Sequence, residues 1–227
     1  MKKLILTSLF LSFYAFASDA PMKLDTSELK MLRDNHQVIK ELKSPKGAWP
    51  VVRLYQVIDA SPLEATAIFF ALDYQKDYVP NLVRSDIAKV VSPTEVWVEY
   101  EMDMPWPLSN SVYLHGHKLK KKAKDHYRID WWMESSNTTE LVKGHAEFLP
   151  FDQGKTLMLY QNYVIPKSIL ASFIKGTMIK DVQKSLSAIK DHIVYCKNKK
   201  KELLKKYKGF ILDSLNGKSV YTLNKRK

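Results

Sequence analysis

The alternation of apolar and acidic side chains near the middle of the chain limits its fold more than any other feature. Every second residue there is apolar, at Val96, Val98, Tyr100, Met102 and Met104. The residues between them include Glu99, Glu101 and Asp103. Because successive side chains of a strand point to opposite faces, the pattern predicts a β-strand with one apolar and one acidic face. A sheet built from such strands needs a cover on one face only.

The same period of two residues marks further strands. It runs from Tyr127 to Glu134 and from Val142 to Phe148. Four more segments have strand character: Trp49 to Ile58, Leu82 to Val91, Ser109 to Lys121 and Thr156 to Ile165. Turn residues separate neighbouring strands, at Ser92-Pro93-Thr94, Ser135 to Thr138 and Asp152-Gln153-Gly154. We expect a curved, seven-stranded antiparallel sheet.

Three helical segments are predicted before the second strand. The first can be capped by Thr26 or Ser27 and runs to about Leu42, after which Ser44-Pro45-Lys46-Gly47 ends it. Two short helices then follow the first strand, over Leu63 to about Leu72 and over Tyr74 to Pro80.

A long amphipathic helix is predicted from Lys167 to about Tyr195. Its apolar residues recur at three to five positions, at Phe173, Met178, Val182, Leu186, Ile189 and Ile193. A curved sheet with one apolar face can be closed by laying this helix across it. The predicted fold class is α+β, with a cavity between the sheet and the helix.

Residues 1–17 have the layout of a secretory signal peptide. Lys2 and Lys3 precede an apolar run from Leu4 to Phe16, and Ala15-Phe16-Ala17 provides small residues for cleavage. The run is shorter than the about 20 residues that span a membrane. We expect cleavage near Ala17 and a periplasmic or secreted protein; a buried N-terminal helix is the alternative.

The charge balance and the single cysteine restrict the partners. The formal net charge is +12, from 36 Lys and Arg against 24 Asp and Glu, which favours an anionic partner. For an exported protein we do not expect a nucleic acid as the partner, which leaves an anionic membrane surface as the candidate. Cys196 is the single cysteine, so no internal disulfide or cysteine-rich zinc site can form. We expect Cys196 to be a packing residue.

The order of the predicted elements and three motifs resemble a known superfamily. The motifs are Val57-Ile58-Asp59-Ala60-Ser61-Pro62-Leu63-Glu64, Asp73-Tyr74 with Tyr78-Val79-Pro80-Asn81, and Met104-Pro105-Trp106-Pro107-Leu108-Ser109-Asn110. Over about Trp49 to Cys196, the chain is similar to the helix-grip fold of the START and polyketide cyclase superfamily (SRPBCC), which includes coenzyme Q-binding START-like proteins. START domains usually have an Arg-Asp pair where this chain has Ser111-Val112.

The resemblance implies a deep apolar pocket for a lipid, sterol, isoprenoid or polyketide. Large, polarizable side chains suit such ligands. The candidate ligand contacts are Tyr100, Met104, Trp106, Tyr113, Trp131, Met133, Phe148, Tyr163, Phe173 and Met178. The alternative is that they are core residues only. The chain then divides into a signal peptide (1–17), an N-terminal helical segment (18–47), a START-like domain (48–196) and a basic extension (197–227).

Histidines and carboxylates are the candidates for chemistry. His115 and His117 share one face of a strand at a spacing that can chelate a metal, and His145 could lie on a nearby strand. No third ligand can be placed, so we expect solvent-facing histidines, no metal and no cofactor. The carboxylates of residues 99, 101 and 103 could supply an acid and a base, but their alternation predicts that they face water. No phosphate loop, nucleophile elbow or Cys–His signal is present.

Two lysine-rich clusters could contact a membrane. The first comprises Lys118, Lys120, Lys121, Lys122, Lys124 and Arg128. In the second, apolar residues interleave with the candidate membrane contacts Lys199, Lys200, Lys201, Lys205 and Lys206. Two structures remain open for this second cluster: a basic amphipathic continuation of the last helix, or a solvated tail. Residues 212–227 are expected to be loosely ordered.

The expected function is binding of a lipid or other hydrophobic small molecule in the cavity, and carriage to or from a membrane. A cyclase or hydrolase-type enzyme using the same cavity is the first alternative. It would need a titratable group with a perturbed pKa inside the pocket. A non-catalytic protein-interaction module is the second alternative, expected if side chains fill the cavity.

Overall fold

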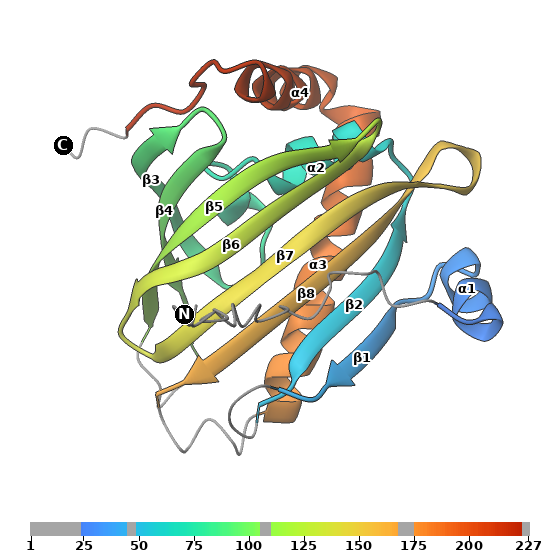
Figure 1. The fold of residues 1–227 in the computed structure, drawn as a ribbon, viewed down its shortest axis with the longest axis horizontal. Coiled ribbons are helices and arrows are strands. Elements are labelled where there is room, and N and C mark those ends of the chain that lie inside the picture. The colour runs from blue at the N-terminus through green and yellow to red at the C-terminus, as the bar shows by residue number, and fades with distance from the viewer. Residues whose placement is uncertain (1–23, 45–48, 105–109, 168–174, 224–227) are drawn as a thin grey trace, which may run out of the picture.

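The computed structural model describes residues 24–44, 49–104, 110–167 and 175–223, which form a single eight-stranded antiparallel sheet and the helices around it (Figure 1). The sheet order is β1-β2-β8-β7-β6-β5-β4-β3. The strands are β1 Val38–Leu42, β2 Val51–Ile58, β3 Leu82–Ser92, β4 Glu95–Met102, β5 Ser111–Ala123, β6 His126–Ser136, β7 Thr139–Phe151 and β8 Lys155–Pro166. The predicted signal peptide lies outside the described residues.

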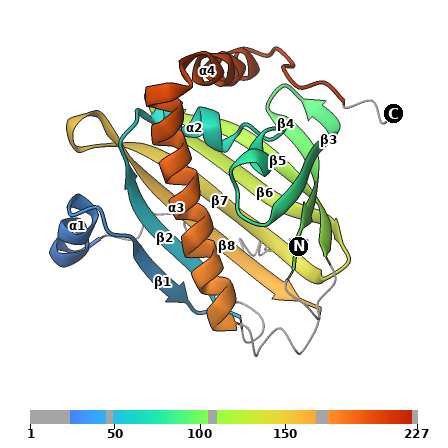
Figure 2. The same ribbon diagram turned by 180° about the vertical axis from the view of Figure 1, so that it is seen from behind.

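The long helix α3 (Lys175–Lys199) crosses one face of the sheet (Figure 2). Its stripe of Leu186, Ile189 and Ile193 is buried in the main core. The carbonyl of Leu186 also accepts a hydrogen bond of 3.0 Å from Nε2 of Gln56 on β2. We call the face under α3 the inner face and the opposite face the outer face. The predicted α+β class, with a helix across an antiparallel sheet, is confirmed.

The helix predicted from residue 26 to residue 42 is wrong beyond its second turn. Asp25 caps the helix α1 (Thr26–Arg33) by accepting from the amide of Glu28, so the predicted caps Thr26 and Ser27 are wrong. The helix ends where Asn35 takes a left-handed conformation with φ 67°. The amides of Asn35 and His36 return to the carbonyls of Leu32 and Met31, as in a Schellman motif. The chain then forms β1, which was not predicted, so the sheet has eight strands and not seven.

Two short helical segments follow β2, close to where they were predicted. The helix α2 (Pro62–Phe69) begins at Ser61, which forms a capping box with Glu64. It is shorter than the predicted span to Leu72. The 3-10 helix η1 (Gln75–Asp77) takes the place of the second predicted helix, and a second 3-10 turn, η2 (Asp152–Gly154), joins β7 to β8. Both α2 and η1 lie on the inner side of the sheet (Figure 2).

The basic C-terminal segment is a separate helix that packs on the domain. The backbone breaks at Lys200 (φ −121°, ψ 51°), and α4 (Lys201–Leu215) follows. Its residues Leu204, Tyr207 and Ile211 are buried in the main core, and α4 contacts α2. Of the two alternatives for this basic segment, an amphipathic helix and a solvated tail, the structure shows the helix.

The expected loose order of residues 212–227 is wrong up to residue 223. The side chain of Tyr221 is buried. Its hydroxyl donates to the carbonyl of Phe70 and accepts from the amide of Leu72 over 3.2 Å. These bonds fasten the chain after α4 to the end of α2. Residues 224–227 lie outside the described residues.

Adjacent tryptophans on β6 point to opposite faces, and each packs over a glycine of a neighbouring strand. Trp131 pairs with Gly144 of β7 on the inner face, and Trp132 pairs with Gly116 of β5 on the outer face. A Cβ atom on either glycine would overlap the indole ring above it. The two glycines therefore make room for the two rings.

Candidate functional site

A cluster of polar side chains lies on the inner face, inside an otherwise apolar surface. We call Gln75, Tyr100, Tyr113, His115 and His117 the inner polar cluster. Tyr113 and the two histidines are alternate residues of β5, Tyr100 comes from β4, and Gln75 comes from η1. The rings are close: the centroids of Tyr113 and His115 lie 4.5 Å apart, and those of Tyr100 and His117 lie 5.7 Å apart.

Hydrogen bonds join three members of the cluster in a chain. The Tyr100 hydroxyl lies 3.1 Å from Nε2 of His117 and donates to Oε1 of Gln75 over 2.7 Å. Gln75 in turn donates Nε2 to the carbonyl of Phe69 at the end of α2, over 2.8 Å. Burial holds the pKa of Tyr100 well above its usual range, so the phenol keeps its proton.

Two imidazole nitrogens of the cluster have no hydrogen-bond partner within the part of the chain that the structure describes. They are Nε2 of His115 and Nδ1 of His117. The two side chains are only 9% and 7% exposed. Burial lowers the pKa of His115 to about 3, and burial, with a smaller effect of His115, holds the pKa of His117 well below its usual range. Both imidazoles are therefore neutral near neutral pH.

The expectation that these histidines face solvent is wrong, and the sequence contained the signal that contradicts it. His115 and His117 share the parity of Tyr113 and Leu119, whereas Lys118 has the opposite parity. Leu119 is 2% exposed on the inner face. The strand keeps one register through this segment opposite β4, so the histidines must share the face of the leucine.

His145 lies on the other face of the sheet, so it cannot join His115 and His117 in a metal site. It alternates on β7 with Val142 and Ala146, which belong to the inner core. In the described part of the chain, no group of three His, Cys, Asp or Glu side chains is placed to hold a metal ion.

Aromatic side chains surround the inner polar cluster. Trp131 and Met133 lie opposite His117 and His115 on the next strand. The Trp131 ring stacks on Tyr160 with centroids 5.1 Å apart, and its Nε1 donates to Oδ1 of Asn162 over 3.1 Å. Reasoning from sequence missed both the histidines and these two β8 residues as components of the inner face.

The structure places the predicted ligand contacts unequally. Tyr100, Trp131 and Phe148 are buried in the inner core, Tyr113 and Met133 pack against it, and Met104 is partly buried after the end of β4. Trp106 and Phe173 lie outside the described residues, as does the side chain of Met178.

Tyr163 belongs to the outer face, in contrast to the prediction that it contacts the ligand. On β8 it alternates with Asn162 and Val164, and Val164 packs against the inner core. The prediction failed because the segment is apolar at both parities, with Leu157 and Leu159 on the outer face. Alternation therefore could not assign the faces of this strand.

The acidic residues of β4 also lie on the outer face, as expected, and an arginine pairs with them. Arg84 of β3 contacts Glu99 through Nη1 and Glu101 through Nη2, the latter at 3.2 Å. Asp103 is exposed after the strand end. None of the three can exchange protons with the inner polar cluster across the sheet.

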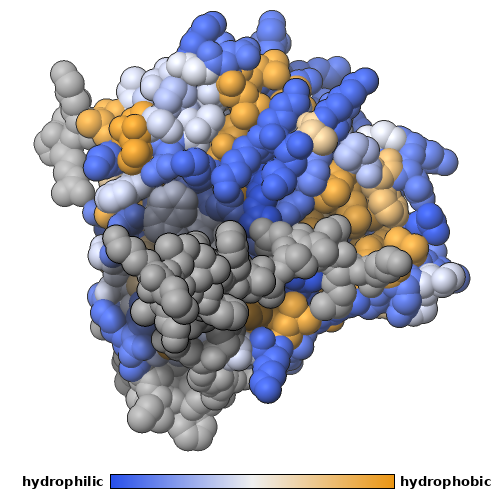
Figure 3. All heavy atoms as spheres, in the orientation of Figure 1, coloured by the Kyte–Doolittle hydropathy of each residue, from blue (hydrophilic) through white to orange (hydrophobic). Residues whose placement is uncertain are grey.

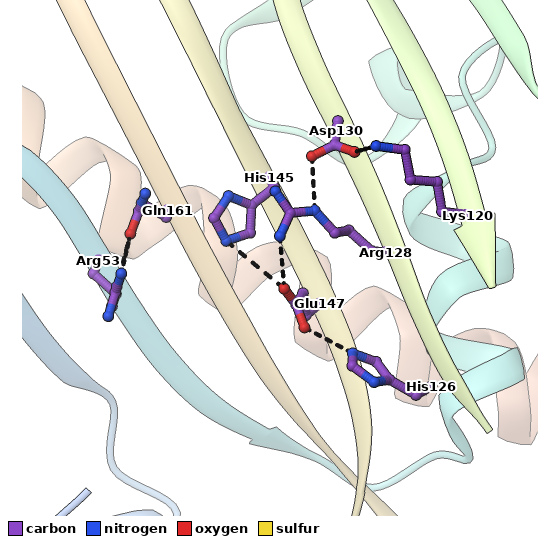
Figure 4. Close-up of polar contacts among 8 residues, drawn as sticks. All are labelled: Arg53, Lys120, His126, Arg128, Asp130, His145, Glu147 and Gln161. Atoms are coloured by element: carbon purple, nitrogen blue, oxygen red, sulfur yellow. Dashed lines mark hydrogen bonds and ion pairs between the residues drawn. The ribbon is translucent and has the colours of Figure 1, made fainter. Parts of the chain in front are cut away.

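The outer face carries an ion network (Figure 4). Arg128 donates to Glu147 over 2.9 Å and to Asp130 over 2.7 Å, and Lys120 contacts Asp130 at 2.7 Å. His126 lies 2.7 Å from the second oxygen of Glu147. Burial alone would raise the pKa of Asp130, but the bonds from Lys120 and Arg128 lower it. Figure 3 shows hydrophilic side chains over these central strands.

Cys196 is a packing residue, although it does contact a histidine. Its sulfur lies 3.3 Å from Nε2 of His192, one turn earlier on α3, and this nitrogen also lies 3.1 Å from the Tyr74 hydroxyl. Burial raises the pKa of the Cys196 thiol to about 11, so the thiolate is scarce at neutral pH. The pair is therefore not an activated nucleophile.

The five candidate membrane lysines are all exposed, at the junction of α3 and α4 and along α4. Figure 1 shows the turn between β5 and β6 near the start of α4, and α4 contacts β5. That turn carries the exposed Lys121, Lys122 and Lys124. A shallow surface hollow of about 390 Å³ on α4 is lined by Lys205 and Lys206 among others. No helix in the described residues is long and apolar enough to cross a membrane.

Comparison with known proteins identifies the fold. No family model matches the chain, and no curated protein matches it in sequence. The STAR-related lipid transfer protein from Xanthomonas axonopodis matches with a TM-score of 0.62 and 15% identity, over 69% of this chain and 93% of that chain. Human STARD10 matches with a TM-score of 0.62 and 11% identity, over 84% and 88%. The Zhui aromatase/cyclase from Streptomyces sp. R1128 matches with a TM-score of 0.50 and 11% identity, over 64% and 94%. The chain has a START-like helix-grip fold.

Proposed function

We propose that this START-like chain binds a lipid or other hydrophobic small molecule against the inner face, between the sheet and α3. The observation that carries the proposal is the inner polar cluster, with two buried nitrogens that no described side chain satisfies. A buried polar atom without a partner costs free energy, so a bound molecule that supplies the partner is favoured. The aromatic rings around the cluster would hold its apolar part.

The names of the fold neighbours are consistent with this proposal. Two of them are named STAR-related lipid transfer proteins, one from Xanthomonas axonopodis and one from humans. Fold likeness alone does not transfer function. The inner polar cluster provides the argument that belongs to this chain.

An enzyme of the cyclase type is the second candidate, because titratable groups with perturbed pKa values do lie on the inner face. Binding without catalysis is favoured over it. A general base works best when its pKa lies near the working pH, whereas burial lowers the pKa of His115 to about 3. Such imidazoles suit hydrogen bonding to a bound molecule better than proton abstraction.

Carriage to or from an anionic membrane is the second part of the proposal, for a protein exported by its N-terminal signal peptide. An acyl chain gains about 0.8 kcal/mol per methylene on leaving water, but almost nothing on leaving a bilayer. Pocket affinity therefore contributes little to extraction. The exposed lysines of α4 and of the β5–β6 turn could each contribute about 1 kcal/mol of attraction near an anionic surface.

A matched pair of tryptophan variants tests the binding face. Trp131→Ala removes a ring from the inner face, and Trp132→Ala removes the neighbouring ring from the outer face. We expect Trp131→Ala to weaken binding of an uncharged fluorescent fatty-acid methyl ester about tenfold or more, and Trp132→Ala to leave it unchanged. Circular dichroism and thermal unfolding would verify that both variants fold. Equal effects would contradict binding at the inner face.

Salt and charge reversal test the membrane part separately. Transfer of the fluorescent lipid between anionic vesicles should slow as salt rises, since salt screens charges over roughly 8 Å at physiological strength. Reversal to Glu at Lys199, Lys200, Lys201, Lys205 and Lys206 should slow transfer more than it weakens binding in solution. Transfer that is insensitive to both changes would contradict docking through these lysines.

A further inference from the structure

The hydrogen bonds around His117 fix which of its nitrogens carries the proton. The chain of bonds begins at Gln75, whose Nε2 faces the carbonyl of Phe69 at 2.8 Å and must donate to it. The atom of Gln75 that faces Tyr100 is therefore Oε1, which can only accept. The Tyr100 hydroxyl must donate its single proton to this oxygen.

The same direction continues to His117. Because the Tyr100 hydroxyl gives its proton to Gln75, its oxygen must accept at the 3.1 Å contact with Nε2 of His117. His117 thus holds its proton on Nε2. The neutral imidazole then has a bare lone pair on Nδ1, which is the buried nitrogen without a partner. That nitrogen can only accept a hydrogen bond.

We propose that the bound molecule carries a hydroxyl group that donates its proton to Nδ1 of His117, with Nε2 of His115 as the second partner of the same oxygen. This inference rests on the proposed function. The histidine ring centroids lie 6.1 Å apart, and both unpartnered nitrogens are buried on the inner face. The ligand class is then a neutral amphiphile, an alcohol or a phenol.

The chemistry of the cluster separates this class from other amphiphiles. A carbonyl, ether or carboxylate oxygen has no proton to give to Nδ1. An N–H group could donate to it but could not also accept from His115. The cluster contains no charged side chain, so a charged headgroup would be buried there without a counter-charge, which is costly. A hydroxyl group can both donate and accept with one atom.

The inference is tested with two ligands, one with and one without a proton on the terminal oxygen. They are a long-chain primary alcohol and its methyl ether, each used to displace an uncharged fluorescent fatty-acid methyl ester from the delipidated full chain. Wild type should bind the alcohol roughly tenfold more tightly, the effect of one buried hydrogen bond. His117→Gln can keep an N–H toward Tyr100 but lacks Nδ1, so we expect the preference to disappear while the ether binds as before.

The control variant is His126→Gln, which makes the same change on the outer face and should keep the preference. Nitrogen-15 NMR of the histidines gives a readout on the unaltered protein. His117 should show the Nε2–H tautomer, and its Nδ1 shift should move with the alcohol and not with the ether. An Nδ1–H tautomer would overturn the inference.

The outcomes separate this inference from the proposed function. If wild type binds the alcohol and the ether equally, the hydroxyl assignment is overturned and hydrophobic binding stands. If neither ligand nor the fluorescent methyl ester binds, the proposed function fails and the inference fails with it.

Discussion

The buried polar groups at the centre of the two faces of the sheet differ in their charge. On the inner face, His115 and His117 are neutral, and each keeps one nitrogen without a described partner. On the outer face of the adjacent strands, Arg128 and Glu147 are equally buried but ion-paired at 2.9 Å. The two faces of the same sheet thus provide different electrostatic environments.

The difference indicates where stability and function lie. A buried charge is tolerated only with a partner, and the charges of Arg128, Glu147 and Asp130 are paired within the chain, so the outer network contributes to the fold. Neutral polar atoms without partners are less costly, and a ligand can satisfy them. We therefore propose a structural role for the outer network and a binding role for the inner polar cluster.

Removal of the central carboxylate of the outer network should have the largest effect on stability. Glu147→Gln leaves Arg128 buried with part of its counter-charge lost, which should cost about 3 kcal/mol of the free energy of unfolding. The matched control Glu140→Gln changes an exposed residue of the same strand and should cost less than about 0.5 kcal/mol. Urea denaturation measures both. Similar values for the two variants would remove the structural role of the network.

An alanine should destabilise the protein more at Gly144, on the buried inner face, than at Gly116, on the partly exposed outer face. A Cβ on Gly144 would overlap the carbonyl oxygen of Gln161 as well as the buried Trp131 ring, so Gly144→Ala should cost about 2 kcal/mol. At Gly116 only the partly exposed Trp132 ring is close, and it can move outward. Gly116→Ala should therefore cost less, as judged from thermal unfolding. The reverse order would show that the outer ring is the more rigid one.

Acid should weaken the fold through the inner histidines, because they are neutral when buried. The pKa of His115 lies at about 3 in the folded protein, against 6.5 for the ordinary side chain. Between these values the unfolded chain binds a proton that the folded chain does not. Stability should therefore fall as the pH drops from 6.5 toward 3, by up to about 1.4 kcal/mol per pH unit for each such histidine.

Denaturation at a series of pH values measures this slope. His115→Phe should make the slope shallower, because its share of the proton uptake is removed. His126→Gln on the outer face serves as the control. An unchanged slope in His115→Phe would mean that His115 is protonated in the folded protein.

The sequence predicted those features that follow from a regular period. Alternation on β4 and β6 assigned Tyr100 and Trp131 to the apolar face, and the stripe of α3 was correctly placed across the sheet. The faces of β8 could not be assigned, because both parities are apolar around Tyr160 and Tyr163. The break between α1 and β1 was missed because Leu32 and Ile39 fit a helical spacing, although Asn35 is a residue that tolerates the left-handed turn.

The candidate site was only partly predictable from the sequence. Its aromatic residues follow from alternation, but its polar members depend on contacts between distant segments. Gln75 of η1 reaches Tyr100 of β4 only after the chain turns back over the sheet. The tautomer of His117, and with it the ligand chemistry, follows from that contact and not from any local pattern.

Photo-crosslinking with a diazirine-labelled fatty alcohol tests the central claim most directly, since it reports which face of the sheet the ligand contacts. After irradiation and digestion, mass spectrometry locates the modified residues. We predict adducts on the inner-face side chains of Tyr113, His115, Trp131 and Met133, and loss of these adducts when unlabelled alcohol competes. Adducts confined to the outer face of the same strands, or to α4, would contradict binding between the sheet and α3.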